Sequence, residues 1–448
     1  MSSVNVAALQ MGVIGTPSNW ASLDANNLSG ILVPAFDRVL ADQIENHTLM
    51  FRKFIKQKTK NWKPGTAYGF NVKLRRNTGA AVTVDNGNIP AGALPGTRRG
   101  YVYSKWGVNS LSVTDGLVAS LGDPEAFVDE LVFLVEELEE GVEESLARWV
   151  YLDGTGVLAT LSDTGSPTGT DVTLDVNMYL MMDQEVEIWN AARTTKRGNA
   201  FVTNLAFDAP DASFSVVSGG VAALPTGTIA TDVVCIRGSQ DGTAGRLNFI
   251  GLEGMVDDGT EVSNYEQISE TSNPEWASYI LALTAGDTDW DTDKMHRLYQ
   301  GVPSRGGAEF DLLIVNPYFA RTYSEFFQPA VTYHNGNAHA ATAGFSSLDF
   351  KSGQRKKAEI EEDRLCPPGT MYAISTKEVM WLQRKAFGWR PTSLGRTMDS
   401  GGGAFAASQT QLNYNGAYTW CGELATKRRN AHGKITGLNI TPESYAVL

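Results

Sequence analysis

The sequence GDPEAFVDELVFLVEELEEGVEESLARWVYLDG, at residues 122–154, contains the longest helical pattern of the chain. Asp123 followed by Pro124 is typical of a helix start, since aspartate caps the first turn and proline fits the first helical position. Gly154 is a typical helix end. About thirty residues at 1.5 Å each predict a rod roughly 45 Å long. Its apolar residues recur at helical spacing: Phe127, Leu131, Leu134, Val135, Leu138, Val142, Leu146, Trp149 and Val150.

The other faces of this helix are acidic. Arg148 is the only basic residue before the helix ends, so pairs four residues apart cannot offset the carboxylates. The simplest interpretation is an acidic face in water, but like charges repel unless cations come from outside the helix. The helix carries the acids Glu125, Asp129, Glu130, Glu136, Glu137, Glu139, Glu140, Glu143 and Glu144. Its candidate contact residues are Glu136, Glu137, Glu139, Glu140, Glu143 and Glu144.

Charge is distributed unevenly along the chain. Residues 52–105 hold twelve basic residues and one acidic residue, a net charge of +11. Residues 122–200 hold seventeen acidic and four basic residues, a net charge of −13. One interpretation is that the basic stretch binds nucleic acid. The other is that the two stretches meet, within one chain or between neighbouring copies; the total charge of −13 argues against wholesale wrapping of DNA.

The basic stretch predicts a long β-hairpin at residues 65–115. Ala67–Arg76 (AYGFNVKLRR) and Tyr101–Val113 (YVYSKWGVNSLSV) are strand-like, and the five glycines and two prolines of Asn77–Gly100 predict a flexible loop between them. Two strands alone are marginally stable in water. The hairpin therefore needs a surface, which a neighbouring subunit could supply. Its candidate contact residues are Lys73, Arg75, Arg76, Arg98, Arg99 and Lys105.

The remaining sequence predicts a mixed α+β fold. Residues 1–35 are a polar arm, and Phe36–Lys60 carries apolar residues typical of one or two short helices. Helices are also predicted at Trp290–Gln300 and, after Pro317, at Tyr318–Gln328. Asn248–Gly259 is predicted as a strand that runs into a turn. The other predicted strands are Tyr179–Trp189, Asn199–Ala206, Ser213–Val217, Asp232–Ile236, Phe310–Val315, Ala358–Ile360, Met371–Ile374, Glu378–Lys385, Ala417–Ala425 and Lys434–Leu438.

Composition excludes several classes of protein. With 448 residues, 42% hydrophobic and 10% aromatic, the chain can bury a sizeable core and is not a disordered acidic tail. The first basic residue is Arg38, so no secretory signal is expected, and the long uncharged stretches are too polar to span a membrane. Cys235, Cys366 and Cys421 lie far apart, which favours buried thiols over a disulfide framework or a zinc site.

No catalytic, metal or cofactor site is predicted. The chain lacks the HExxH, GxSxG and GxxxxGK[ST] motifs, and its five histidines are scattered. The acids of the long helix crowd one element, whereas catalytic carboxyls face each other across a cleft. Asp287, Asp289, Asp291 and Asp293 faintly resemble a calcium loop, but the required Gly and Glu are missing, so helix capping is the preferred interpretation.

The order of these parts resembles the major capsid protein of tailed phages, which has the Hong Kong 97-like fold. FSSLDFKSGQRKKAEIEEDRLCPPGTMYAIS (Phe345–Ser375) is similar to two late strands of that family and their Pro-Gly-Thr turn. EFDLLIVNPYFARTYSEFF (Glu309–Phe327) resembles a strand and the helix opened by Asn-Pro. RLNFIGLEGMVDDG (Arg246–Gly259) and YTWCGELATKRRNAHGKITGLN (Tyr418–Asn439) resemble the domain crossover and the returning strand.

The resemblance implies a division of the chain into named parts. The long helix would be the spine helix of a P-domain, and the hairpin would be an E-loop that reaches over an adjacent subunit. The implied parts are an N-terminal arm (1–35), a short helical segment (36–64), the E-loop (65–115), the P-domain with its spine helix (116–163), an inserted small β-unit (164–237), a P-domain crossover (238–279), the A-domain (280–410) and C-terminal P-domain strands (411–448).

It also implies a function without turnover. The chain would assemble with itself as pentamers and hexamers into an icosahedral head around double-stranded DNA, in the host cytoplasm and then in the virion. Portal and scaffolding proteins would be its partners, and a decoration protein could also bind the shell. No membrane partner is implied. An encapsulin-like compartment shell is the alternative of similar fold. A β-rich hydrolase is the alternative from another class, and it would need a cleft of titratable groups.

Overall fold

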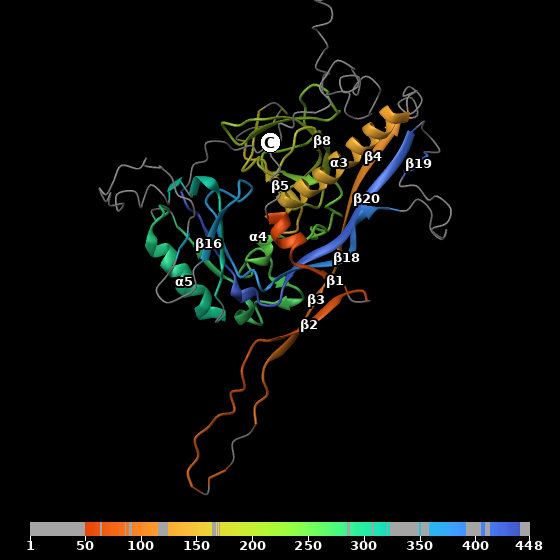
Figure 1. Cartoon of the computed structure of the whole chain (residues 1–448). Helices are drawn as coiled ribbons and strands as arrows, with labels where there is room; N and C mark the ends of the chain where they lie inside the picture. Colours follow the sequence, from red (N-terminus) through yellow and green to blue (C-terminus); the bar gives the residue numbers. More distant parts are fainter. Residues whose placement is uncertain are drawn as a thin grey trace, which may run out of the picture.

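The computed structural model describes the chain from residue 50 to residue 439 with gaps. The described residues are 50–62, 65–114 apart from 86 and 89–91, 124–322 apart from 164–166, 168, 170, 285–286, 307–308 and 320, and then 349–350, 358–390, 405–407 and 413–439. The expected arm at 1–35 lies outside them. The described part is a mixed α+β fold with several sheets and few helices, which confirms the predicted class (Figure 1).

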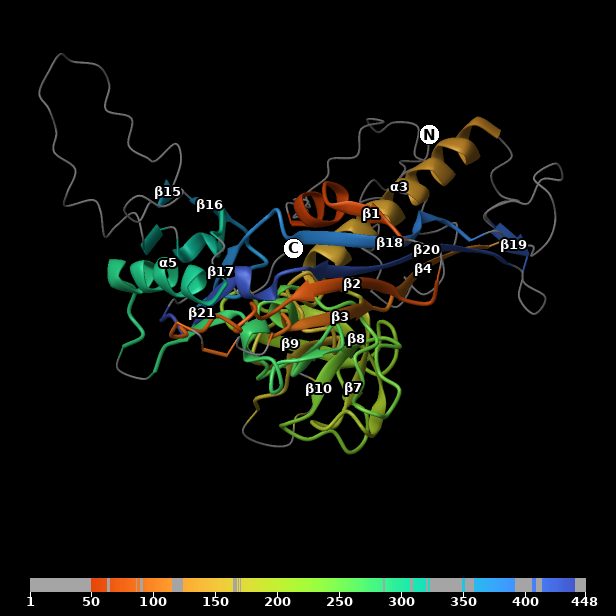
Figure 2. The same ribbon diagram turned by 90° about the horizontal axis from the view of Figure 1, so that it is seen from below.

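The long predicted helix is confirmed as α3 (Pro124–Trp149). Its apolar stripe is buried at Leu138, Val142 and Leu146. Of the acids between these positions, Glu139 and Glu140 are exposed, whereas Glu143 and Glu144 are half-buried. The helix lies beside a five-stranded sheet in both views of the ribbon (Figures 1 and 2). That sheet has the order β1 (Thr59–Asn61), β18 (Val379–Trp389), β20 (Asn413–Thr426) and β19 (Phe405–Ala407), and β4 (Lys105–Thr114) also pairs with β20.

The second strand of the hairpin differs from the prediction. The partner of β2 (Tyr68–Lys73) is β3 (Thr97–Val102), whose first residues were assigned to the loop. β4 pairs with the C-terminal strand β20 instead, from Lys105↔Gly422 to Thr114↔Asn413. Trp106 and Val108 alternate with polar residues as any half-buried strand does, so the pattern alone could not name the partner strand.

A separate β-unit follows the long helix. Its sheet has the order β5 (Val157–Thr160), β10 (Val233–Ile236), β7 (Glu185–Trp189), β8 (Lys196–Leu205), β9 (Asp211–Ser215) and β6 (Val172–Thr173). β5 and β10, the first and last strands, pair with each other, and Ile236 donates its N–H to the Gly156 carbonyl at 2.8 Å. The predicted strand from Tyr179 is wrong in its first half, because residues 179–184 turn before β7 begins.

Arg148 fixes this β-unit to the long helix. The side chain is 2% exposed, and its Nη1 donates to the Met178 carbonyl at 2.6 Å and the Leu180 carbonyl at 3.1 Å. Its Nη2 donates to Glu144, one turn earlier in α3. These two carbonyls and the Glu144 carboxylate compensate the buried charge of Arg148, and together they fix the position of the β-unit on the helix.

A third block combines one sheet and one helix. The sheet has the order β13 (Tyr279–Ala282), β21 (Gly433–Thr436), β17 (Met371–Ile374), β14 (Leu312–Val315), β16 (Ala358–Glu362) and β15 (Asp349–Phe350). α5 (Thr292–Gly306) packs on it through Leu298 and Val302. Asp291 accepts hydrogen bonds from the N–H groups of Asp293 and Lys294, which confirms that the aspartates there cap a helix. Residues 317–319 are helical, and the predicted helix beyond residue 322 lies outside the described residues.

The strand predicted at the start of Asn248–Gly259 is wrong, although the segment does turn. The segment turns into the short helix α4 (Leu252–Met255). Gly251 donates its N–H to the Leu152 carbonyl at 2.9 Å, and Leu252 donates to the Val150 carbonyl at 2.5 Å. The last carbonyls of a helix lack partners within the helix. This segment bonds to carbonyls just past the end of α3, and a side chain at Gly251 would collide with them.

The small elements complete the described chain. The π-helical turn η3 (Phe51–Lys56) buries Phe51, Phe54 and Ile55 against the core, as the apolar pattern of that region predicted. β11 (Asn264–Tyr265) and β12 (Ile268–Ser269) form a tight hairpin, and η4 (Pro274–Trp276) and η6 (Arg429–Ala431) are single 3-10 turns.

The three cysteines are free and buried. Among the described residues, no helix combines the length and the apolar character needed to cross a membrane.

A buried polar cluster surrounds Arg429, which lies in η6 between β20 of the five-stranded sheet and β21 of the third block. Arg429 is 0% exposed and donates to the carbonyls of Gly254 at 2.7 Å and Met255 at 3.0 Å. It forms ion pairs with Asp257 and Glu270. Nearby, His432 is fully buried, accepts a hydrogen bond from the Ser375 N–H at 3.2 Å and contacts Thr426.

We expect the buried His432 to make folding stability depend on pH. Burial lowers the pKa of His432 from 6.5 to about 3. The unfolded chain therefore binds a proton between these values that the fold does not, and stability falls as pH falls below about 6.5. In this window the free energy of unfolding falls by about 1.4 kcal/mol for each pH unit, so His432 lowers it by about 2 kcal/mol at pH 5.

The measurement is chemical unfolding at pH 7 and pH 5 for the wild type and His432→Gln. The variant should show a smaller loss between the two pH values, whatever its stability at pH 7. Equal losses in the two proteins would contradict the expectation.

Candidate inter-subunit surfaces

The hairpin projects from the body as a two-stranded arm. β2 and β3 pair from Tyr68↔Val102 to Lys73↔Thr97, and Phe70, Val72 and Val102 are buried at its root. Between Lys73 and Thr97, the described residues of the hairpin form no strand. Figure 1 shows the arm extending away from α3 and the β-unit. The hairpin therefore presents its surface to whatever lies beside the molecule.

Three of the six basic candidates in the hairpin have partners within the chain. Arg75 Nε binds Glu275 Oε1 at 2.6 Å, and this hydrogen bond lowers the pKa of the Glu275 carboxyl. Arg99 donates to the Asn71 side chain at 3.3 Å across the hairpin. Lys105 donates to the Arg246 carbonyl. Lys73, Arg76 and Arg98 are exposed and form no ion pair with any residue that the structure describes. These last three are the basic groups available to a second molecule.

The acidic candidates form one exposed strip along α3. Glu136, Glu137, Glu139 and Glu140 are exposed. Glu139 and Glu143 add to the burial that raises the pKa of Tyr418 on β20 to about 12. Glu143 pairs with Lys56 at 2.6 Å and Glu144 pairs with Arg148, so the C-terminal end of the strip is neutralised within the chain.

The structure does not bring the two candidate sets together. Among the described residues, no basic candidate of the hairpin pairs with an acidic candidate of α3. Within the part of the chain that the structure describes, the basic and acidic stretches share one ion pair, between Lys56 and Glu143. Glu275 and the Arg246 carbonyl were missed from the sequence, because nothing local marks a distant residue as the partner of an arginine or lysine.

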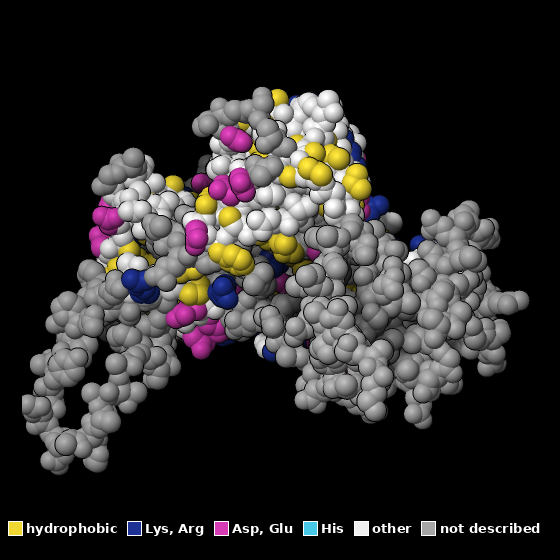
Figure 3. Space-filling view, turned by 90° about the horizontal axis from the view of Figure 1, so that it is seen from above, with side chains coloured by type: hydrophobic (Ala, Val, Ile, Leu, Met, Phe, Trp, Pro, Cys, Tyr) yellow, Lys and Arg dark blue, Asp and Glu magenta, His cyan; other side chains and the backbone are white. Residues whose placement is uncertain are grey.

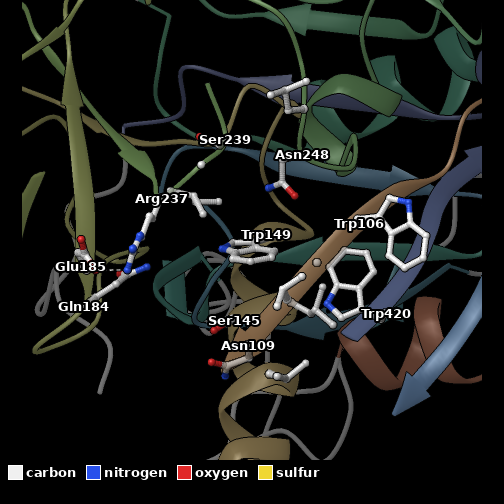
Figure 4. A pocket seen from close by; sticks show the side chains of 17 residues that line it. Trp106, Asn109, Ser145, Trp149, Gln184, Glu185, Arg237, Ser239, Asn248 and Trp420 are labelled. Atoms are coloured by element: carbon white, nitrogen blue, oxygen red, sulfur yellow. Dashed lines mark hydrogen bonds and ion pairs between the residues drawn. The ribbon is translucent and has the colours of Figure 1, made fainter. Parts of the chain in front are cut away.

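A cavity lies between β4, α3 and the β-unit. Its volume is about 330 Å³. Trp106, Trp149 and Trp420 form one side of it, and Gln184, Glu185 and Arg237 form the other (Figure 4). Arg237 and Glu185 form an ion pair with each other. Trp106 is 61% exposed and Val108 is 66% exposed, so the cavity opens to solvent along β4.

Gly107 shapes this cavity. It lies opposite Trp420 in the β4–β20 register, and a Cβ at this position would lie 2.2 Å from the Trp420 ring. We expect Gly107→Ala to destabilise the fold by about 1–3 kcal/mol, because an overpacked site must shift its neighbours. Chemical unfolding measures the change.

Gly141→Ala in α3 is the matched control. A Cβ at Gly141 would meet no atom within 4 Å. This substitution should stabilise the helix by about 0.5–1 kcal/mol, since alanine has the higher helix propensity. A loss of stability in the control, or none at Gly107, would contradict the packing argument.

No catalytic constellation stands out on these surfaces. The described residues contain no group of three or more His, Cys, Asp or Glu that could hold a metal ion. The strongly shifted groups, among them Glu266, Cys366 and His432, are buried within the core and not arranged around the cavity. The geometry provides a projecting arm, a charged strip and a cavity with aromatic and polar walls, which are features of contact surfaces.

The architecture of the described chain is found in a solved phage capsid. The chain is similar to a solved structure of the cyanophage A-1(L) capsid asymmetric unit, with a TM-score of 0.56, 10% identity, and coverage of 92% of this chain and 99% of the other. This similarity establishes a phage capsid-protein fold and confirms the resemblance inferred from the sequence. No protein-family model and no curated protein sequence matches the chain.

Two further structures show weaker similarity. One is the capsid of a native GTA particle, with a TM-score of 0.48, 8% identity, and coverage of 93% of this chain and 100% of the other. The second is an encapsulin complex from Synechococcus elongatus, with a TM-score of 0.41, 9% identity, and coverage of 99% and 98%.

Proposed function

We propose that this chain is the major capsid protein of a tailed phage, which assembles with itself as pentamers and hexamers into an icosahedral head around double-stranded DNA. The observation that carries the proposal is the capsid-protein fold over 92% of the chain. The projecting hairpin supports it, because an arm of two strands is stable only against another surface. Portal and scaffolding proteins, and a decoration protein, would be partners of the assembled shell, located in the virion after assembly in the host cytoplasm.

The proposed parts follow the sequence resemblance. Of the predicted hairpin 65–115, the β2–β3 part acts as the E-loop, because β4 pairs with β20 instead. α3 is the spine helix of the P-domain, residues 164–237 are an insertion, and residues 280–410 form the A-domain. Lys73, Arg76 and Arg98 of one copy meet Glu136, Glu139 and Glu140 of the next, since both sets are exposed. Each surface ion pair contributes only about 0–1 kcal/mol, but a shell repeats it many times, so these pairs set the register of neighbouring copies.

Electron microscopy of the purified chain tests the proposal. Assembly should yield closed particles of uniform size, and co-expression with the neighbouring phage genes should fill them with DNA. Particles that instead enclose a cargo enzyme would favour an encapsulin-like compartment. A chain that stays monomeric at all concentrations, with and without a scaffolding protein, would refute a shell function.

A further inference from the structure

A turn beside the root of the arm has a strained backbone. β11 and β12 are joined by Glu266 and Gln267, and both residues have positive φ angles, 54° and 63°. A two-residue hairpin turn with two positive φ angles is ordinarily built from Asn and Gly, because other side chains are strained in that conformation. Neither residue here is Asn or Gly. Such strain persists only where the surrounding contacts hold it in place, so the contacts of this turn are informative.

The turn holds the arm through its backbone. Tyr101 of β3 donates its N–H to the Glu266 carbonyl at 2.9 Å. Hydrogen-bonded pairs alternate along an antiparallel hairpin, and Leu74 and Gly96 belong to the bonded set of β2 and β3. Tyr101 is in the other set, so its N–H points away from β2. Its bond to Glu266 therefore joins the edge of the arm to the turn and takes no part in the pairing within the arm.

The same turn is bound to the body through a side chain. Glu266 is 9% exposed, and its Oε1 accepts a hydrogen bond at 3.0 Å from the N–H of Thr426, at the end of β20. Burial raises the pKa of the Glu266 carboxyl well above its ordinary value. The neighbouring Tyr265 donates its hydroxyl to the Leu424 carbonyl at 3.3 Å. Glu266 thus contacts the arm with its backbone and the body with its side chain.

A second contact with the arm runs through η4. Arg75, just after β2, binds Glu275 of η4 at 2.6 Å. η4 is fixed to the body in turn, because Asn430 donates its side-chain N–H to the Glu275 carbonyl at 2.8 Å. Arg75 and Tyr101 belong to the two sides of the hairpin. The segment 264–276 therefore holds the arm on both sides.

Beyond these contacts the arm extends clear of the body. Figure 1 shows the described part of the hairpin projecting past β2 and β3 without a neighbouring element. The opposite end of the molecule, seen in Figure 3, carries only small groups of hydrophobic side chains separated by polar ones. An arm supported only at its root takes its direction from the contacts there. Fixing that direction before two molecules meet lowers the entropy cost of their association.

We propose that the segment 264–276 is a bracket that sets the direction of the arm before assembly, and that Glu266 is its positioning residue. The strained turn is retained because it presents the Glu266 carbonyl to Tyr101 while the Glu266 side chain reaches Thr426. The effect on assembly rests on the proposed shell function, whereas the bracket itself is a property of the single chain.

Distance measurements on the unassembled chain test the bracket. Spin labels at Thr78→Cys in the arm and Arg384→Cys on β18 report the direction of the arm, since both positions are exposed and the native cysteines are buried. Glu266→Gly suits the turn but removes the contact with Thr426, so it should broaden the distribution of distances about twofold. Glu266→Gln keeps an acceptor for the Thr426 N–H and should give the wild-type distribution.

The matched control is Gln267→Gly in the same turn. Glycine relieves the same kind of strain there, and the Gln267 side chain is exposed and has no hydrogen bond with any residue that the structure describes. The distances should therefore match those of the wild type. A broader distribution for Glu266→Gly alone supports the bracket. Equal distributions for the two glycine variants, whether narrow or broad, overturn the role of Glu266.

Tyr101→Pro covers the case in which Glu266→Gly does not fold. Proline lacks the N–H that binds Glu266, and the pairing with β2 does not use that N–H, so the hairpin is retained. Arg99→Pro is the control, because the Arg99 N–H also points away from β2 and has no partner in the described part of the chain. Broader distances for Tyr101→Pro alone support the bracket, and equal distances for the two proline variants overturn it.

Assembly separates this inference from the shell function. Glu266→Gly should raise the critical concentration for assembly about tenfold, the effect of one net hydrogen bond, whereas Gln267→Gly should leave it unchanged. An unchanged critical concentration for a Glu266→Gly chain with a loosened arm would overturn the role of arm direction in assembly. Failure of the wild-type chain to assemble would refute the shell function, and the distances in the single chain would still decide the bracket.

Discussion

Reversing the charge of Lys73, Arg76 and Arg98 to glutamate should abolish shell assembly and leave the monomer folded. These side chains are exposed and form no ion pair with the described residues, so their loss removes nothing from the fold of one chain. In the assembled shell the new carboxylates would face Glu136, Glu139 and Glu140, and like charges juxtaposed at a contact cost several kcal/mol. Sedimentation velocity and electron microscopy measure assembly, and thermal unfolding measures the monomer.

Charge reversal at Arg75, which has a partner within the chain, is a less informative control. Arg75→Glu breaks the ion pair with Glu275 within the chain, so its effect on assembly is mixed with an effect on the hairpin root. A rescue experiment is cleaner: changing Glu136, Glu139 and Glu140 to lysine in the same chain should restore assembly. Normal particles from the first triple variant at physiological salt would refute the pairing of arm and strip between copies.

Replacing Arg429 with methionine should cost about 3–5 kcal/mol of folding stability, because removal of one partner of a buried ion pair leaves the other charges without compensation. Arg429 is fully buried, and Asp257 and Glu270 would lose their cation. Three carbonyls, those of Gly254, Met255 and Val262, would lose a donor at the same time. Chemical unfolding of the soluble monomer measures the loss.

The matched control is an arginine on the surface. Arg384 on β18 is exposed, and Arg384→Met should change stability by less than about 0.5 kcal/mol. If the chain carrying Arg429→Met proves insoluble, its soluble fraction relative to the Arg384→Met chain serves as the measurement. Wild-type stability in the Arg429 variant would contradict the view that this buried cluster stabilises the fold.

The sequence predicted elements well where the signal is local. α3 was evident from its apolar period, although it ends at Trp149 and not at the predicted Gly154, and the aspartates before α5 were correctly interpreted as caps. Strand predictions failed where the pairing depends on distant residues. The β4 sequence alternates like a hairpin strand, but β4 pairs with β20. The Asn248–Gly259 segment has strand-forming residues, yet it turns because carbonyls at the end of α3 need donors.

The contact surfaces were only half predictable. The opposite charges of the hairpin and α3 are visible in the composition, and both sets are on the surface apart from pairs such as Arg75–Glu275. The cavity was not predictable, since its walls come from three segments distant in sequence. The only local sign was the glycine between Trp106 and Val108, whose role appears once Trp420 is seen opposite it.

The paired ends of the β-unit make it an exchangeable module. Because β5 and β10 are neighbours, the chain enters and leaves the unit at nearly the same point, and a short linker could join residues 156 and 237. Evolution can add, enlarge or delete a domain between two such adjacent strands without changing the backbone path of the rest of the protein. Deletion of the β-unit would also require a substitution at Arg148. Without the Met178 and Leu180 carbonyls, its buried guanidinium would lose two hydrogen-bond acceptors, so a chain without the β-unit requires an uncharged residue at position 148.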